Sequence, residues 1–253
     1  MINIKPLKAF SDNYIWLLES NEDISVVDPG DAKPVLDYLE NKNKNLVDIF
    51  ITHHHFDHTA GVPELISKIS GSVYGPKNSY ELIRDKVTEG DIISSLGMNF
   101  EVIEVPGHTL DHIAFFNKEN KILFCGDTLF AGGCGRVFEG TFDQMFDSLN
   151  KLKKLPESTQ IYCGHEYTKS NLVFSIGVEP ENSDLVLRNS EIDSLIMKNG
   201  SSLPSSIELE KKTNPFLRCD LLGDNIQLMQ RFGLKNPSEK EIFTHIREWK
   251  DSA

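Results

Sequence analysis

The chain lacks long apolar runs and paired cysteines, and each absence excludes a class of protein. No stretch reaches the ~18 consecutive apolar residues that a membrane-spanning helix needs, and the opening MINIKPLKAF has no apolar signal-peptide core. No CxxC pair occurs, so neither a zinc ribbon nor a disulfide framework is expected. We therefore expect a cytoplasmic protein without a membrane partner, in which four cysteines stay reduced: Cys125, Cys134, Cys163 and Cys219.

Positive charge is also scarce. The 26 Lys and Arg residues are outnumbered by 38 Asp and Glu residues, which gives a formal net charge of −12. Nucleic-acid binding depends on cationic contacts to phosphates, so nucleic acid is not expected as a partner. The length of 253 residues and the 39% hydrophobic content allow a substantial core, in one large domain or in a large and a small one. We expect a monomer.

Short apolar segments alternate with amphipathic segments as far as Tyr167, and helical patterns follow. We therefore expect a mixed α/β domain over residues 1–168 and a helical domain over residues 169–253. The expected strands are 14–20, 24–30, 46–52, 100–107, 112–117, 121–130 and 160–166. The expected helices are 32–40, 62–70 and 141–155, then one from Ser183 to a stop at Gly200 and one over 238–250, which opens with a capping box.

The segment FITHHHFDHTAG, residues 50–61, places four histidines and an aspartate within six positions. On an extended segment His53 and His55 project to the same side, while His54 points elsewhere. Asp57 and His58 follow after the chain turns. Two groups of donors this close together suit two adjacent metal ions, although a solvated histidine-rich turn is the alternative.

Three further donors follow expected strands, each directly after a glycine: His108 in VPGHT, Asp127 in FCGDTLF and His165 in YCGHEY. A glycine removes side-chain bulk where the backbone must approach a site closely, although Gly-Asp is also ordinary turn chemistry. Imidazole and carboxylate donors suit zinc, iron or manganese, and the donors do not select among them.

These motifs resemble those of a known family. THHHFDH has the T-H-x-H-x-D-H form of the metallo-β-lactamase superfamily, and the chain resembles the hydroxyacylglutathione hydrolases, or glyoxalase II enzymes, of that superfamily. The superfamily motif is shared by many enzymes, whereas GCGRVFEGT and CGHEYT followed by a helical tail are more specific. The other matching segments are FSDNYIWLL, VDPG, PGHT, GDTLF, NPFLR and IREWK.

The resemblance implies an α/β fold, the αββα metallo-β-lactamase-like sandwich, with a smaller C-terminal helical domain and a site for two divalent metal ions, zinc in the first place. One ion is then expected on His53, His55 and His108. The other is expected on Asp57, His58 and His165, with Asp127 bridging the two. Three histidines are left over: His54 and His245 are expected at the surface, and His112 either supports a ligand or belongs to the core.

Two cations that share a water molecule provide a nucleophile at neutral pH. Lowering the pKa of water from ~15.7 to ~7 corresponds to about 12 kcal/mol in favour of hydroxide. The sequence has no GxSxG elbow and no cysteine in a nucleophile motif. We therefore predict a metal-bridging hydroxide as the nucleophile, with Asp57 holding a metal and orienting the hydroxide or accepting its proton. A thiolate, with a conjugate acid near ~8.5, leaves without a strong general acid, which favours a thioester substrate over an amide.

The resemblance further implies an S-(2-hydroxyacyl)glutathione substrate, above all S-D-lactoylglutathione, which would yield glutathione and D-lactate in methylglyoxal detoxification. Arg136, Arg247 and Lys250 are candidates to hold the two glutathione carboxylates, although each is also a candidate for a solvated surface charge. Tyr167 matches a family hydroxyl contact. Two positions depart from the family pattern. Phe138, also expected to contact the substrate, replaces a tyrosine found in some members, so one hydroxyl contact is absent or replaced. Asp111 stands where glycine is usual and puts an extra carboxylate near the expected metals.

Three other functions compete with this interpretation. A mononuclear iron persulfide dioxygenase of the same superfamily shares much of the HxHxDH region, but CGHEYT and the helical tail count against it. A β-lactamase or a nuclease is disfavoured by the lack of a secretion signal and by the negative charge. A non-enzymatic metal-binding module does not account for so complete a ligand set.

Overall fold

A computed structural model of the chain describes residues 2–77 and 80–253. The fold comprises two compact units, and the chain passes between them several times. The first unit contains the residues up to Glu104 together with Asp111–Gly126 and Tyr162–Glu166, and the second contains Val105–Leu110, Asp127–Ile161 and Tyr167–Ala253. The boundary expected after residue 168 stays a prediction, because these units are interleaved along the sequence.

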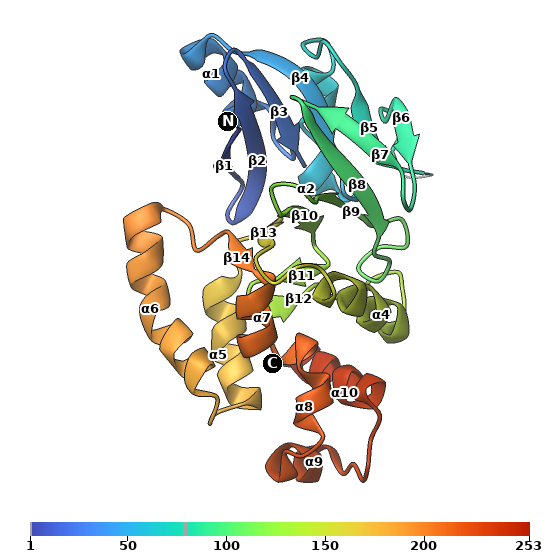
Figure 1. The fold of residues 1–253 in the computed structure, drawn as a ribbon, viewed down its shortest axis with the longest axis vertical. Coiled ribbons are helices and arrows are strands. Elements are labelled where there is room, and N and C mark those ends of the chain that lie inside the picture. Colours follow the sequence, from blue (N-terminus) through green and yellow to red (C-terminus); the bar gives the residue numbers. More distant parts are fainter. Residues whose placement is uncertain (1, 78–79) are drawn as a thin grey trace. The chain divides into compact units, whose positions relative to one another are not determined.

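The first unit contains a six-stranded sheet in the order β1-β2-β3-β4-β5-β6 (Figure 1). Its first three strands are antiparallel, and β3 to β6 are parallel. The strands expected over 14–20, 24–30 and 46–52 are confirmed as β2, β3 and β4. The sheet's strands are β1 (Asn3–Ala9), β2 (Asn13–Ser20), β3 (Asp23–Val27), β4 (Asn45–Phe50), β5 (Val73–Pro76) and β6 (Asp85–Val87).

Helices α1 (Ala32–Lys42) and α3 (Val62–Leu65) pack on this sheet through one apolar cluster, which includes Val35, Leu65 and Ile49. The Asp31 side chain caps α1 by accepting a hydrogen bond from the Lys33 backbone N–H. The helix expected over 62–70 was predicted too long. After Leu65 the chain returns to the sheet, where the Ser70 N–H donates to the Leu46 carbonyl at 3.0 Å instead of extending the helix.

Within the first unit, four neighbouring antiparallel strands of a six-stranded second sheet form a layer against the first sheet. They are β7 (Ile92–Ser95), β8 (Met98–Glu104), β9 (Ile113–Asn117) and β10 (Ile122–Gly126), in the order β10-β9-β8-β7. The Phe50 ring meets Phe100 at 5.4 Å and Phe115 at 5.1 Å between ring centroids, so the two layers share an aromatic core. The strand expected over 121–130 ends earlier, at Gly126, where φ is +46° and the chain leaves the strand direction.

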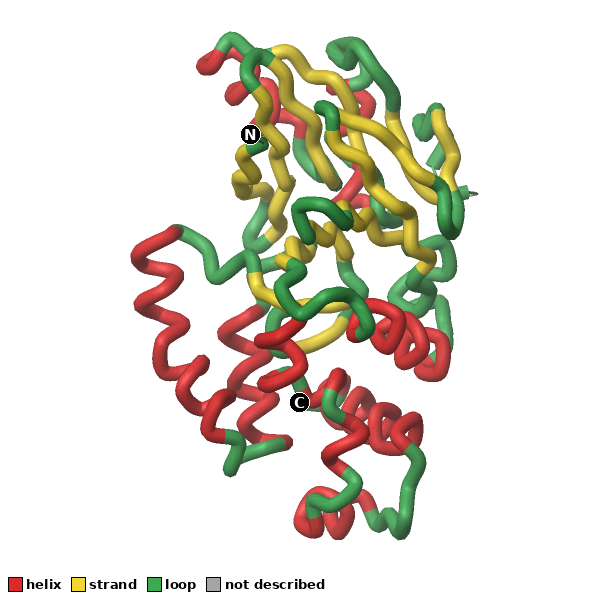
Figure 2. Tube along the Cα trace, in the orientation of Figure 1, coloured by secondary structure: helices red, strands yellow, loops and turns green. Residues whose placement is uncertain are grey.

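The second unit is mostly helical, and the chain after Tyr167 is nearly all helix in Figure 2. Its long helices are α4 (Phe142–Lys153), α5 (Thr168–Val178), α6 (Ser183–Asn199) and α10 (Glu239–Asp251), and its short ones are α7 (Ile207–Thr213), α8 (Cys219–Leu222) and α9 (Ile226–Phe232). The expected stop of α6 at Gly200 and the capping box of α10 are both confirmed.

Three short strands also belong to the second unit: β11 (Leu129–Phe130), β12 (Gly133–Cys134) and β14 (Ser205–Ser206). The pairing of β14 with the first half of β13 (Gln160–Cys163) was not predicted, because two serines carry no strand pattern. Among the helices of residues 2–77 and 80–253, none has the length and apolarity needed to cross a lipid bilayer.

Candidate metal centre

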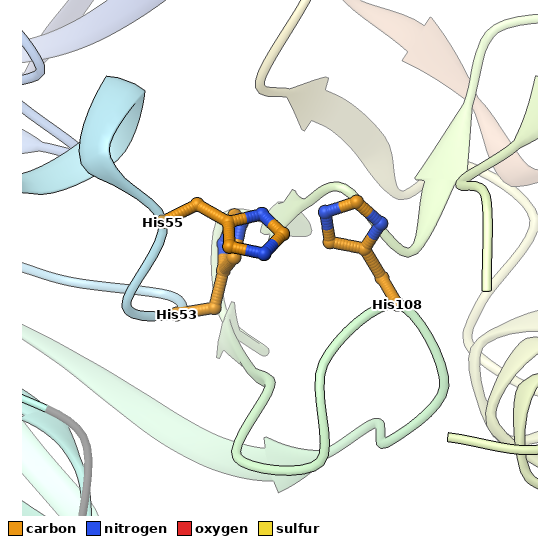
Figure 3. A group of neighbouring side chains, drawn as sticks. All are labelled: His53, His55 and His108. Carbon is orange, nitrogen blue, oxygen red and sulfur yellow. The ribbon is translucent and has the colours of Figure 1, made fainter. Parts of the chain in front are cut away.

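The histidine-rich segment lies on the loop after β4 and on the one-turn helix α2 (Phe56–Thr59). The ring centroid of His53 lies 4.7 Å from that of His55 and 4.2 Å from that of His58. His53 and His58 are buried, and His55 is half-buried. Figure 3 labels His53 and His55, which both lie on this loop, and also labels His108 on the loop after β8. The local turn thus gathers three imidazoles that are adjacent in sequence.

Asp57, His58 and His165 come together within the first unit. The Nε2 atom of His165 lies 3.3 Å, and that of His58 3.5 Å, from Oδ2 of Asp57. One donor atom from each residue falls within 4.8 Å of the other two, which is close enough for a single ion. His165 follows β13 of the second sheet, whereas Asp57 and His58 follow β4 of the first, so the fold brings together residues that are more than 100 positions apart.

Asp28 orients two imidazoles, that of His58 directly and that of His53 through the Thr52 hydroxyl. Its Oδ2 accepts a hydrogen bond from Nδ1 of His58 at 3.0 Å and another from the Thr52 hydroxyl at 2.7 Å. That hydroxyl in turn accepts from Nδ1 of His53 at 3.0 Å. Because Nδ1 of each ring carries the proton, Nε2 is the atom left to bind a metal.

The turn between β1 and β2 supports the other two members of the group. Nδ1 of His165 donates to Oδ1 of Asp12 at 2.7 Å. The Asn13 side-chain amide donates to Oδ2 of Asp57 at 2.9 Å and to its backbone carbonyl at 3.2 Å. The Asp12 carboxylate therefore limits rotation of the His165 ring, and the Asn13 amide limits rotation of the Asp57 carboxylate.

Four supporting residues were not predicted from the sequence: Asp12, Asn13, Asp28 and Thr52. A signal was nevertheless present, because FSDNYIWLL and VDPG place polar residues beside buried strands, where a polar group needs a partner. Asp28 also adopts a positive φ of +52°, which is uncommon for a residue other than glycine.

In the second unit, His108 and Asp127 form a second pair of buried donors. Nε2 of His108 lies 3.5 Å from Oδ2 of Asp127. Nδ1 of His108 donates to the main-chain carbonyl of Arg136 at 2.7 Å, which again leaves Nε2 as the ligand atom. His108 follows β8 and Asp127 follows β10.

These donors fit divalent metal ions. Four imidazoles, those of His53, His58, His108 and His165, each have Nδ1 in a hydrogen bond to an oxygen. Histidine ligands in metalloproteins are typically held in this way by an oxygen on the second nitrogen. Imidazole nitrogen and carboxylate oxygen together suit zinc, iron and manganese.

The three remaining histidines occupy different surroundings. Nδ1 of His54 is paired with Oδ1 of Asp111 at 3.0 Å, so the departure at position 111 gives this half-exposed imidazole a partner. His112 is buried, and its ring is stacked on His53 at 4.6 Å between centroids. His245 lies on α10 and is stacked on Phe232.

Arg247 lies in the interior of the second unit and is only 3% exposed. Its Nη1 donates to the Cys134 carbonyl and its Nη2 to Oδ1 of Asp251, both at 3.0 Å. Arg136 is largely exposed, and its Nε lies 3.6 Å from the same Asp251 oxygen. One carboxylate at the end of α10 therefore meets both predicted substrate-binding arginines.

Lys250 is shielded by aromatic rings, with its ammonium group 5.6 Å from the ring centroid of Phe174 and 5.7 Å from that of Phe216. The ammonium donates to the Asn171 side-chain oxygen. Removal from water disfavours the charged form, and this lowers the pKa of Lys250 to about 8.

The two predicted aromatic contacts also lie in the second unit. Phe138 is exposed, and its ring centroid lies 5.6 Å from the Arg136 guanidinium and 5.3 Å from the His108 ring. Tyr167 precedes α5, and its ring meets Phe130 at 5.2 Å.

Comparisons with known proteins identify the family. The sequence model of the metallo-β-lactamase superfamily matches residues 10–165, and that of the hydroxyacylglutathione hydrolase C-terminus matches residues 166–253. The hydroxyacylglutathione hydrolase of Pseudomonas syringae pv. syringae (strain B728a) is 50% identical over 257 residues, which cover 99% of each chain. The chain belongs to the hydroxyacylglutathione hydrolase family. The family resemblance and the metallo-β-lactamase fold with a C-terminal helical region are thereby confirmed.

Two solved structures are also similar in fold. ETHE1 from Myxococcus xanthus matches with a TM-score of 0.66 and 25% identity, over 94% of this chain and 93% of its own. The BLEG-1 B3 metallo-β-lactamase matches with a TM-score of 0.65 and 21% identity, over 86% of this chain and 99% of its own. The fold is thus common to proteins with different names, so function within it depends on the residues of the site.

Proposed function

We propose that the protein is a metal-dependent thioester hydrolase, which converts S-(2-hydroxyacyl)glutathione to glutathione and the 2-hydroxy acid. S-D-lactoylglutathione is the proposed substrate, D-lactate the product and methylglyoxal detoxification the role. The observation that carries this proposal is the similarity over the full length to relatives named for this reaction, including the family-specific segment 166–253. The same segment favours this function over the iron persulfide dioxygenase.

For the metal ions, we propose two sites. His53, His55 and His108 would hold one ion, and Asp57, His58 and His165 the other, with Asp127 shared. The hydrogen-bonded Nδ1 atoms of the imidazoles and the proximity of donors within each unit support this assignment. We propose zinc, with iron and manganese as alternatives. When bound, such ions supply a water of lowered pKa, from ~15.7 towards ~7, and polarise the carbonyl group of the substrate.

Asp57 is the proposed catalytic carboxylate. Its Oδ2 accepts a hydrogen bond from Asn13 at 2.9 Å, which fixes the carboxylate in position to act on the attacking water as general base. The departing thiolate, whose conjugate acid has a pKa near ~8.5 in ordinary thiols, needs no protonation by the protein. With the metal ions bound, the residues of the site would therefore suffice for hydrolysis of a thioester.

For substrate binding, we propose Arg136, Lys250 and Tyr167 as polar contacts and Phe138 as an apolar one. Lys250 and Arg136 would attract the glutathione carboxylates. Arg247 would act from the interior, through the Cys134 carbonyl and Asp251. We also propose that residues 1–168 form the catalytic domain and residues 169–253 a substrate-binding domain.

We propose the cytoplasm as the compartment and a monomer as the working form. All four cysteines are buried, which suits the thiols of a protein kept under reducing conditions. Light scattering after size exclusion would test the monomer.

The decisive experiment follows thioester loss from S-D-lactoylglutathione, with metal content measured on the same preparation. A matched substrate, the lactoyl thioester of N-acetylcysteamine, keeps the reacting bond but lacks both glutathione carboxylates. We expect turnover of the first and a much higher KM for the second. Absence of turnover with two metal equivalents bound would refute the substrate, and sulfite production from glutathione persulfide would identify the dioxygenase instead.

A further inference from the structure

The segment from Asp127 to Arg136 forms a short hairpin within the second unit. Strands β11 and β12 pair Leu129 with Cys134, and the Gly135 N–H donates to the Thr128 carbonyl at 3.2 Å. Asp127 is the first residue of this hairpin. At its other end, the carbonyl of Arg136 accepts the hydrogen bond from His108. The base of the hairpin thus presents one proposed metal ligand and orients another.

Side chains from the C-terminal helices bind the main chain at the hairpin tip. Glu210 of α7 and Asn214, which follows α7, contact both sides of the tip. The Gly132 N–H donates to Oε2 of Glu210 at 2.8 Å. The Asn214 amide donates to the carbonyls of Phe130 at 3.2 Å and Gly133 at 2.9 Å.

Residues of α5 and α10 bind three neighbouring points. The Ser175 hydroxyl donates to the Gly132 carbonyl at 2.8 Å. The Asn171 amide donates to the Ala131 carbonyl at 3.1 Å, and Arg247 donates to the Cys134 carbonyl at 3.0 Å. Consecutive peptide groups of the tip are therefore held by side chains rather than by a neighbouring strand.

Glu210 is the centre of this arrangement. Its side chain has no exposed surface, and Oε1 meets Nη2 of Arg188 at 2.7 Å. The carboxylate also accepts from Ser205 and from Asn214. A buried ion pair adds little net stability, because desolvation offsets most of the Coulomb attraction. Placing a fully buried carboxylate here is better explained by the need for a rigid acceptor at the Gly132 N–H.

Two glycines show how closely the hairpin packs. A Cβ atom at Gly133 would lie 2.7 Å from Cγ of Asn171 and 2.8 Å from Nζ of Lys250. A Cβ atom at Gly135 would lie 1.9 Å from the carbonyl oxygen of Asp127. The GCGR segment therefore owes its glycines to this close approach.

We propose that Glu210 and Asn214 are positioning residues, which hold the hairpin tip so that its base presents Asp127 and orients His108. By fixing the main chain at Gly132, they limit the movement of Asp127 at one end of the hairpin and of the Arg136 carbonyl at the other. The expected effect on turnover rests on the proposed function, whereas the effect on the hairpin and on metal retention does not.

The test compares Glu210→Gln with Glu179→Gln in the full-length protein. Glu179 is a matched control, because it forms a largely shielded pair with Arg218 at 2.9 Å in the same unit, and its carboxylate bonds run to Arg218 instead of to the hairpin. Hydrogen exchange of the amides in residues 128–135 is measured in both variants and in the wild type. We expect faster exchange in Glu210→Gln alone.

Two further measurements, turnover kinetics and metal retention, distinguish a positioning role of Glu210 from a purely structural one. We expect kcat with S-D-lactoylglutathione to fall at least about tenfold in Glu210→Gln, with a smaller change in KM, because displaced catalytic groups lower the chemical rate. Metal loss to a chelator should accelerate by about tenfold or more, as when groups that orient ligands are removed. The Glu179→Gln variant should match the wild type in both.

Three results would overturn the proposal: unchanged exchange in Glu210→Gln, the same changes in Glu179→Gln, or altered exchange with unchanged kcat and metal retention. If Glu210→Gln does not fold, Ser175→Ala replaces it, since that variant deletes one hydroxyl contact to Gly132 and leaves no charge unpaired. If the wild type does not hydrolyse the thioester, exchange and metal retention still decide the role of Glu210.

Discussion

The two units hold their histidines by different means. In the first unit, His53, His58 and His165 are oriented by side-chain oxygens of residues that lie on neighbouring strand ends and turns. In the second unit, His108 is oriented by a main-chain carbonyl, that of Arg136. Side-chain partners can be removed by single substitutions, whereas a carbonyl can be displaced only by moving the segment that carries it.

The largest expected effect comes from Asp57, the carboxylate donor of the first unit. Asp57→Asn keeps the shape of the side chain but removes its charge and its ability to accept a proton. We expect kcat to fall on the order of 10³-fold, with a loss of bound metal. Steady-state kinetics and metal analysis measure the two effects. Full activity in this variant would exclude Asp57 as the catalytic carboxylate.

The support by side-chain oxygens can be tested at Asp28. Asp28→Asn weakens the hydrogen bonds to His58 and Thr52, so metal affinity should fall about 10- to 100-fold. Competition with a chelator measures the affinity. Asp48→Asn is the matched control, since Asp48 is an equally buried aspartate of the first unit, which binds Ser72 and Ser95. Equal losses in both variants would point to a general loss of packing.

In the second unit, the shielded ammonium of Lys250 predicts a pH dependence. Because its pKa is lowered to about 8, Lys250 is protonated below pH 8 and becomes neutral above it. Loss of this charge should raise KM up to about tenfold as the pH rises through 8, with little change in kcat. Arg247, which keeps its charge, Asp251 and the thiol of Cys134 are the other ionisable groups that influence this ammonium.

Lys250→Met provides the check on this assignment. The variant should show the high KM at every pH, because it lacks the titrating charge. A wild-type KM that does not vary between pH 7 and 9, both flanking the expected pKa of about 8, would contradict the role of Lys250.

The smallest effect is expected at Arg136, whose side chain is 59% exposed. An exposed ion pair contributes only about 0–1 kcal/mol, so Arg136→Gln should raise KM no more than about fivefold. The difference from the wild type should shrink at high salt, because salt screens exposed charges. A large effect that is independent of salt would mean that Arg136 acts in a shielded position, as Arg247 and Lys250 do.

Most ligand candidates could be found from the sequence, because each follows a strand or a turn whose pattern is local. The crowding of His53, His55, Asp57 and His58 needs no tertiary information. The ends of strands are also readable in sequence, and this pointed to His108, Asp127 and His165. The helix after Val62 and the strand through Gly126 were predicted too long, because the chain after Leu65 returns to the sheet and the backbone at Gly126 turns at a positive φ of +46°.

The amino-acid sequence by itself determined the family and the fold class and pointed to the candidate metal donors, because these depend on residue type and spacing. Only the tertiary structure decided which atoms support them. Asp28 and Asp12 orient imidazoles 30 and 153 positions away, and Glu210 binds a peptide group 78 positions away. Such contacts arise from chain reversals that bring distant segments together, and no local pattern encodes the partner of a buried polar group.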